Sequence, residues 1–104
     1  MYEYLISEAL ERRQIFSNLK TYLEKLKEMV LKVDPRAEVY VFGSVAEDRY
    51  NYSSDVDILV VTEVDKLKVL EVIVKEEFTK VFEIHIRNHK DATWYKKMTR
   101  LVRV

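Results

Sequence analysis

The spacing of apolar residues changes at Asp34-Pro35, and this change most constrains the fold. Over residues 2–33 apolar side chains recur every three or four positions, which predicts one helix of about thirty residues, on the order of 45 Å long. Proline cannot continue the helical hydrogen bonds and restricts the residue before it, so the helix ends there. The apolar positions are Tyr2, Leu5, Ala9, Phe16, Leu19, Leu23, Leu26, Val30 and Val33, with an interruption at Arg12.

A helix of this length would extend beyond a small sheet, so its first half needs a second surface to pack against. One possibility is a break near Arg12 that folds the stripe back onto the chain's own core. The other is that the first half contacts a second copy of the chain or a partner protein. The sequence leaves both open, and the second predicts a homodimer or hetero-oligomer formed through this helix.

Three later segments have the pattern of β-strands. Residues 37–42 alternate and are rich in β-branched and aromatic side chains. Residues 54–61 contain Asp-x-Asp followed by an apolar run, and residues 81–88 alternate again. A strand places alternate side chains on opposite faces. In the third strand one face carries Phe82, Ile84 and Ile86, and the other carries Val81, Glu83, His85 and Arg87.

Helical segments separate and follow the strands. Residues 44–53 predict a short helical turn and a loop. Residues 65–78 predict an amphipathic helix, and residues 91–101 predict another within a basic C-terminal segment of residues 90–104. The expected buried faces are Leu67, Leu70, Val74 and Phe78 in the first helix and Trp94, Met98 and Leu101 in the second.

The order α-β-α-β-α-β-α predicts a single α+β domain over residues 1–104, with a small mixed sheet and helices on one side. Its parts are an N-terminal helix (1–34), a strand-loop-strand-helix-strand core (37–88) and a basic C-terminal helix (90–104). A chain of 104 residues supports one hydrophobic core but not a catalytic domain plus a substrate domain.

The composition excludes several classes of protein. The 18 basic and 18 acidic residues cancel, so no overall field favours nucleic acid or a membrane surface. Without a membrane-spanning apolar run, a signal-peptide pattern or any cysteine, we expect a cytoplasmic protein with no disulfide or thiolate metal site. One glycine and one proline among many Glu, Lys, Val and Tyr residues resemble the composition of thermophile proteins.

The single glycine, Gly43, directly precedes Ser44 at the end of the first predicted strand. A turn or helix start offers backbone N–H groups without partners, glycine lets a phosphate approach them, and the serine hydroxyl adds a donor. After ten more residues, Asp55 and Asp57 open the second strand. Two carboxylates on one strand face, with Cα atoms roughly 6.5 Å apart, repel each other unless a cation lies between them, and Mg²⁺ is the natural candidate.

If the first two strands are antiparallel neighbours, the phosphate-binding pair and the aspartates share one end of the sheet. That arrangement suits nucleotidyl transfer, in which metal ions bridge phosphates and a hydroxyl attacks the α-phosphorus opposite a pyrophosphate leaving group. Glu83 is the best placed third carboxylate, and a role as an ordinary exposed residue paired with a base is an equal alternative. For His85, Tyr50 and Tyr52 the ordinary exposed roles are favoured.

The two motifs, Gly43-Ser44 and Asp55-Val56-Asp57 with its following apolar residues, resemble the signature of the DNA polymerase β-type nucleotidyltransferase superfamily. The closest likeness is to its minimal nucleotidyltransferases, and the resemblance covers residues 20–90. It implies a nucleotidyltransferase fold and adenylyl transfer from MgATP. The acceptor in such systems is typically a tyrosine of a partner HEPN-type toxin, whose ribonuclease activity the antitoxin silences.

By position, the resemblance implies that Gly43 and Ser44 hold the triphosphate, Asp55 and Asp57 bind Mg²⁺, and Glu83 completes the catalytic and metal site. The chain departs from the family after Ser44. Members often carry basic residues there, whereas this sequence continues Val-Ala-Glu-Asp before reaching Arg49.

The acidic residues in this stretch, Glu47 and Asp48, leave the activity open. Either Arg49 supplies the missing positive charge for the nucleotide, or the two acids weaken the site. In the second case the chain would be a catalytically degenerate binding module that neutralises a toxin by docking. A nucleotidyltransferase that modifies a small molecule, similar to the aminoglycoside-modifying enzymes, is the weakest alternative.

Overall fold

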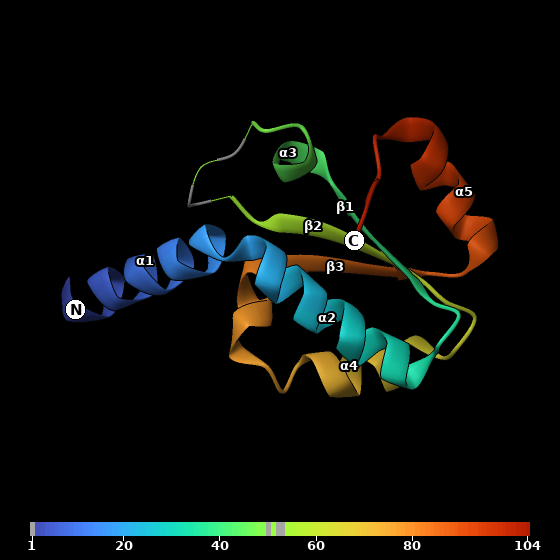
Figure 1. Ribbon diagram of the computed structural model, residues 1–104, viewed down its shortest axis with the longest axis horizontal. Helices are drawn as coiled ribbons and strands as arrows, with labels where there is room; N and C mark the ends of the chain where they lie inside the picture. The colour runs from blue at the N-terminus through green and yellow to red at the C-terminus, as the bar shows by residue number, and fades with distance from the viewer. Residues whose placement is uncertain (1, 50, 52–53) are drawn as a thin grey trace.

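A four-stranded mixed sheet forms the centre of the computed structural model, which describes residues 2–49, 51 and 54–104 (Figure 1). The strand order is β3-β2-β1-β4. β1 is antiparallel to β2 and to β4, whereas β2 is parallel to β3. The strands are β1 (Glu38–Phe42), β2 (Val56–Val61), β3 (Phe82–Arg87) and β4 (Val102–Arg103). The expected α+β class and the antiparallel pairing of the first two strands are therefore confirmed.

Helices cover both faces of this sheet, so the expectation that they lie on one side is wrong for the last of them. α2 and α4 pack on one face, and α5 packs on the other (Figure 1). The physical reason lies in β2, whose residues 58–61 are all buried, since a strand apolar on both faces needs cover on both. The helices are α1 (Tyr2–Ser17), α2 (Leu19–Val33), α3 (Gly43–Ala46), α4 (Lys66–Ile73) and α5 (His89–Met98), with a 3₁₀ helix η1 (Glu77–Val81) before β3.

The predicted single N-terminal helix is divided at Asn18, not near Arg12. The backbone N–H of Asn18 lies 3.2 Å from the Gln14 oxygen and 3.1 Å from the Ile15 oxygen, and its side-chain amide also donates to Gln14, at 3.0 Å. Asparagine favours such local bonds over a regular helix, which explains the break. α1 then extends beyond the rest of the molecule (Figure 1), with Ile6 60% and Leu10 59% exposed.

The apolar faces of α4 and α5 differ from those expected. In α4 the buried residues are Val69 and Ile73, whereas Leu67 and Val74 are exposed. The predicted set mixed residues of α4 with Phe78, which belongs to η1. Because the chain breaks between the two helices, the 3.6-residue repeat does not continue from one into the other. Apolar positions spaced over both segments therefore do not lie on one face.

The C-terminal helix is shorter than expected and ends at Met98. Its buried residues are Ala92 and Tyr95, while Trp94 and Met98 face solvent. Residues 102–103 form the edge strand β4, and Val104 N–H donates to the Val39 oxygen at 2.9 Å. A two-residue strand has no period to detect, so the sequence pattern could not predict it.

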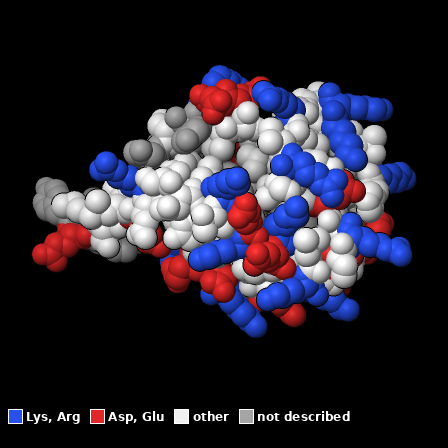
Figure 2. Space-filling model, in the orientation of Figure 1, with Lys and Arg blue, Asp and Glu red and all other residues white. Residues whose placement is uncertain are grey.

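Charges of both signs are spread over the surface. Figure 2 shows Lys and Arg side chains projecting over much of the body, with Asp and Glu side chains between them. This agrees with the net charge of zero and gives no extended field for a polyanion. Within the described residues, no helix combines the length and apolar character needed to cross a membrane.

Candidate functional site

The candidate site lies where β1 ends and β2 begins. Phe42 is the register partner of Asp57, and Asp57 is in turn the partner of Glu83 on β3. Gly43 follows Phe42 directly, so the predicted phosphate-binding turn and Asp57 do meet at one end of the sheet. The topology thus brings together residues from three segments of the chain, as the antiparallel arrangement predicted.

Asp57, Glu83 and His85 form a cluster on the sheet face that α5 covers. Each offers a ligand atom, and these atoms all lie within 4.8 Å of one another. Their common face follows from the strand period, because Asp57 and Glu83 are aligned and His85 lies two residues further along β3. Glu83 therefore lies beside Asp57, on the same face of the sheet.

Gly43 is required at this point by its backbone and by its neighbour. Its φ is +74°, in the left-handed region that L side chains rarely adopt. A Cβ atom at this position would lie 2.2 Å from Oδ2 of Asp57. The turn can therefore pass directly beside the Asp57 carboxylate only because residue 43 has no side chain.

The negative charge of Asp57 is destabilised by its surroundings, and a bound cation would stabilise it. Burial raises its pKa above the ordinary value of 3.8, and the hydrogen bond and negative charge of Glu83 raise it further. The charge of Asp55 acts in the same direction. Two or three mutually repelling oxygen ligands on one partly buried surface are the donor set that a divalent cation prefers, so the residues fit a metal.

Asp55 is placed at the rim of this cluster. Its side chain is 57% exposed and forms a 3.5 Å ion pair with Arg12, whose own side chain is 19% exposed. The same guanidinium donates to the Ser54 backbone oxygen at 2.6 Å. The interruption at Arg12 in the helical stripe therefore has a role, because it brings a positive charge from α1 to the start of β2.

The structure places His85 in the cluster with Asp57 and Glu83, whereas the sequence interpretation favoured an ordinary exposed role for it. Its Nδ1 lies 3.1 Å from the Tyr95 hydroxyl, and its Nε2 lies 3.6 Å from Oε1 of Glu83. The Phe42 ring packs edge-on against both rings, with centroids 5.2 Å from His85 and 5.6 Å from Tyr95. The sequence did indicate that His85 shares a strand face with Glu83, because the two are two residues apart. The contact with Tyr95 depends on how α5 packs, which the sequence pattern does not give.

Arg49, the expected substitute for the missing basic residues, is exposed and forms an ion pair with Glu47. Its backbone N–H donates to the Ser44 oxygen at 2.8 Å, which closes the turn after α3. Asp48 has φ +56°, a left-handed conformation that aspartate adopts more readily than most residues. Tyr50 and Tyr52, the loop tyrosines considered above, lie outside the described residues.

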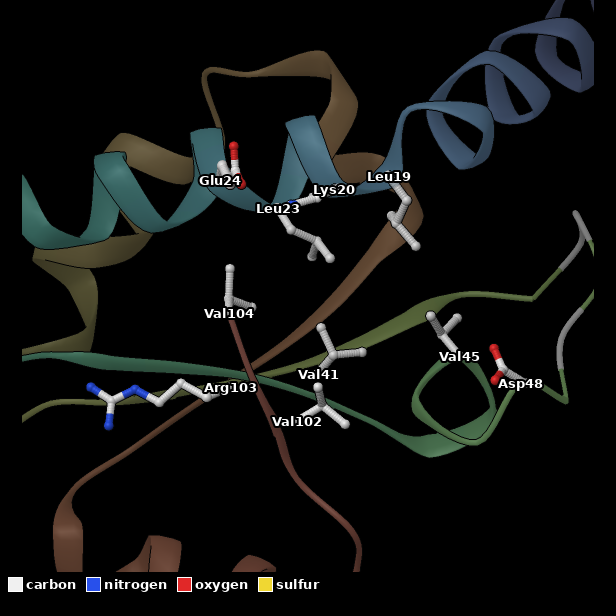
Figure 3. A pocket seen from close by; sticks show the side chains of 10 residues that line it. All are labelled: Leu19, Lys20, Leu23, Glu24, Val41, Val45, Asp48, Val102, Arg103 and Val104. Carbon is white, nitrogen blue, oxygen red and sulfur yellow. The ribbon is translucent and has the colours of Figure 1, made fainter.

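A groove of about 400 Å³ lies between α2, β1, α3 and β4 (Figure 3). Val41 lines it and belongs to the core beneath α2, whereas Phe42 packs on the α5 side, so the groove is on the opposite sheet face from the carboxylates. Charged residues such as Lys20 and Arg103 accompany its apolar lining. The groove and the acidic cluster are therefore separate features.

A family model and a solved structure match this chain to a nucleotidyltransferase domain. A family model described as a nucleotidyltransferase domain matches residues 19–103. A solved structure described as a candidate nucleotidyltransferase is 32% identical, with a TM-score of 0.61, and covers 80% of this chain and 97% of that chain. Another, from Sulfolobus solfataricus and described in the same way, is 24% identical with a TM-score of 0.49, covering 91% of this chain and 84% of that one. A search of curated proteins found no match.

Proposed function

The chain belongs to the nucleotidyltransferase domain family, and from this premise we propose that it transfers an adenylyl group from MgATP to a hydroxyl group of a partner protein. The observation that carries the proposal is the meeting of the Gly43 turn with Asp57 and Glu83 at one end of the sheet. Asp57 and Glu83 would hold a divalent cation there, and such a cation would supply positive charge to stabilise the negative charge that develops during transfer.

Gly43 and Ser44 would hold the triphosphate. The N–H groups in the first turn of a helix have no partner within the helix, and the absence of a side chain at residue 43 lets the start of α3 lie directly beside Asp57. Asp57 and Glu83 would hold the metal, with Asp55 joining them from the rim once its ion pair with Arg12 opens. Arg49 would bind the nucleotide phosphates only after its ion pair with Glu47 had broken.

The reaction needs a base as well as a metal site. The acceptor oxygen forms a bond to the α-phosphorus while the bond to pyrophosphate breaks, and the hydroxyl proton must leave. A carboxylate placed beside the acceptor can take that proton. Glu83 is aligned with Asp57 and its side chain is 59% exposed, so an acceptor can reach it and we assign it the proton.

We propose a tyrosine of a HEPN-type toxin as the acceptor, which would make this chain an antitoxin. The supporting feature is α1, which lies outside the family match and exposes Ile6 and Leu10. Exposed apolar side chains on a projecting helix suit a protein partner. Through the same helix the chain would form a hetero-oligomer with the toxin, or a homodimer in its absence.

The test is an adenylyl transfer assay with the purified chain, a HEPN-type toxin and ATP labelled at the α-phosphate. Wild type should label the toxin in the presence of Mg²⁺, and mass spectrometry should locate one adenylyl group on a tyrosine. Asp57→Asn should abolish labelling while leaving the complex intact. Ile6→Lys with Leu10→Lys should weaken the complex without changing metal binding. Unchanged transfer by Asp57→Asn would disprove the assignment of this site.

A second candidate function is docking without transfer. Glu47 and Asp48 favour it, because two acids beside the Gly43-Ser44 turn oppose the approach of a triphosphate. In that case wild type and Asp57→Asn should bind and inhibit the toxin equally, with no labelled product. Glu47→Gln with Asp48→Asn should then restore measurable ATP binding.

A further inference from the structure

We propose that His85 is a metal ligand of this site, together with Asp57 and Glu83, and that the site therefore prefers Mn²⁺ to Mg²⁺. The inference rests on the proposed function for the presence of a metal site and goes beyond it in naming a nitrogen ligand. Mg²⁺ favours an all-oxygen shell, whereas imidazole nitrogen binds first-row transition metals better.

The first argument is position. Leu59 is the register partner of His85, as Asp57 is of Glu83, so the imidazole lies one step deeper on the same face of the sheet as the two acids. Its Nε2 is 3.6 Å from Glu83 Oε1, and the three potential ligand atoms fall within 4.8 Å of one another. A single cation can contact all three after only small side-chain movements.

The second argument is that the imidazole is held in one orientation. Tyr95, a buried residue of α5, contacts Nδ1 through its hydroxyl at 3.1 Å. A hydroxyl can accept a hydrogen bond, so Nδ1–H can donate to it and leave the Nε2 lone pair directed at the carboxylates. Histidine ligands usually have the second ring nitrogen fixed in this way, because the contact sets both tautomer and ring direction.

The third argument concerns the surrounding packing. Phe42, which directly precedes the phosphate turn, packs edge-on against both His85 and Tyr95. The ring of His85 therefore stands between two aromatic side chains and the carboxylate pair, instead of extending into solvent. A histidine that served only as an exposed counter-ion for Glu83 would not need this support.

The chain allows a clean spectroscopic test because it contains only two histidines, His85 and His89. His89 lies at the start of α5 and contacts Glu63 and Glu38 instead of the acidic cluster. We would load the full chain with Mn²⁺, record its electron paramagnetic resonance, and use electron spin echo modulation to detect a directly bound ¹⁴N. Competition with Mg²⁺ would give the ratio of the two affinities.

Wild type should show the ¹⁴N modulation and bind Mn²⁺ at least tenfold more tightly than Mg²⁺. His85→Gln should lose the modulation and lower Mn²⁺ affinity about 10- to 100-fold, the range found when an ordered metal shell is disturbed, with a smaller change for Mg²⁺. His89→Gln should retain the wild-type behaviour. Tyr95→Phe should keep the modulation but weaken Mn²⁺ binding, since the ring loses its orienting contact.

The outcomes separate this inference from the proposed function. Asp57-dependent binding of Mn²⁺ without ¹⁴N modulation in wild type would overturn the assignment of His85 and leave the carboxylate site intact. Modulation that persisted in His85→Gln but vanished in His89→Gln would place the metal elsewhere and also overturn it. Absence of any binding of Mn²⁺ or Mg²⁺ that depends on Asp57 would overturn both. The wild-type spectrum decides the matter even if a variant fails to fold.

Discussion

A Cβ atom on Gly43 would lie 2.2 Å from Oδ2 of Asp57. The only glycine of the chain is therefore packed against the central carboxylate of the candidate site, with no space for a side chain between them. The glycine comes from the end of β1 and the aspartate from β2, and the antiparallel register of these strands brings them together. The turn that is expected to bind phosphate is thus fixed against the residue that is expected to bind metal.

Gly43→Ala should destabilise the protein and impair metal binding. The left-handed φ alone costs about 1–2 kcal/mol for a residue with a side chain, and the clash with Asp57 adds to this by displacing a ligand. We would measure urea unfolding and Mn²⁺ affinity. Asp57→Ala provides the matched background, because it removes the two closest clashing atoms, Oδ2 and Cγ.

In that background Gly43→Ala should cost only the conformational strain. The double-mutant cycle should therefore show coupling between positions 43 and 57. Additive effects of the two substitutions would mean that the contact has no energetic consequence.

Asp57→Asn should stabilise the metal-free protein at neutral pH. Burial first, and then Glu83, raise the pKa of Asp57 above 3.8. A carboxyl group whose pKa rises on folding binds its proton more tightly in the folded state. The wild type should therefore gain stability as pH falls through that raised pKa, and the gain should be complete below 3.8. The variant lacks this ionisation, so the difference between the two proteins should shrink over the same interval.

The measurement is the thermal midpoint of both proteins across this pH range, with and without a divalent cation. Only the difference between the two proteins is informative. Asp34, Glu38 and Glu63 have lowered pKa values, so their protonation at low pH reduces the stability of both proteins alike. A divalent cation should raise the midpoint of wild type and not of Asp57→Asn. A constant difference at all pH values would contradict the prediction.

Arg12→Gln should tighten binding of a divalent cation several-fold at low ionic strength. Its guanidinium lies 3.5 Å from Asp55, where it competes with a metal for the carboxylate and repels the cation. Added salt should reduce the effect through screening. Arg13→Gln, at the next and exposed position of α1, is the control. Weaker metal binding by Arg12→Gln would instead make Arg12 a support for the site.

Thr62→Val should destabilise the fold without affecting the site. The hydroxyl of Thr62, a residue only 3% exposed, donates to Asp34 Oδ2 at 2.5 Å and joins the end of β2 to the end of α2. Because Asp34 is only partly buried and keeps its bond from the Arg36 N–H, the loss should cost about 0.5–1.5 kcal/mol, the net contribution of an ordinary hydrogen bond. Thr93→Val, at an exposed position of α5, should change stability by no more than about 0.5 kcal/mol.

The pH dependence of this effect follows from the same contact. The bond from Thr62, followed by the Arg36 backbone N–H, lowers the pKa of Asp34 below 3.8. Its stabilisation is present above 3.8 and is lost as pH falls through the lowered pKa. The cost of Thr62→Val, measured by urea unfolding, should therefore decrease in strong acid. An equal cost at every pH would show that only packing had changed.

Local patterns predicted β1, β2 and β3 and where the candidate site residues lie along the chain. Alternation identified β1 and β3, and the two motifs lie where the structure has the end of β1 and the start of β2. The buried faces of the helices were less predictable. The helical repeat of α4 does not continue into η1, and the buried residues of α5 are only Ala92 and Tyr95. The break at Asn18 and the two-residue β4 also depend on hydrogen bonds that periodicity does not encode.

The sequence by itself determined which residue types stand at the ends of adjacent strands, since glycine, serine and carboxylates at those positions follow from chain order and strand period. Tertiary structure alone decided which of them meet. It placed Arg12 beside Asp55 across 43 positions, and it used Tyr95 of α5 to hold His85 against Glu83. Such contacts depend on how helices pack on a sheet, and burial of apolar faces fixes that packing only once the whole chain has folded.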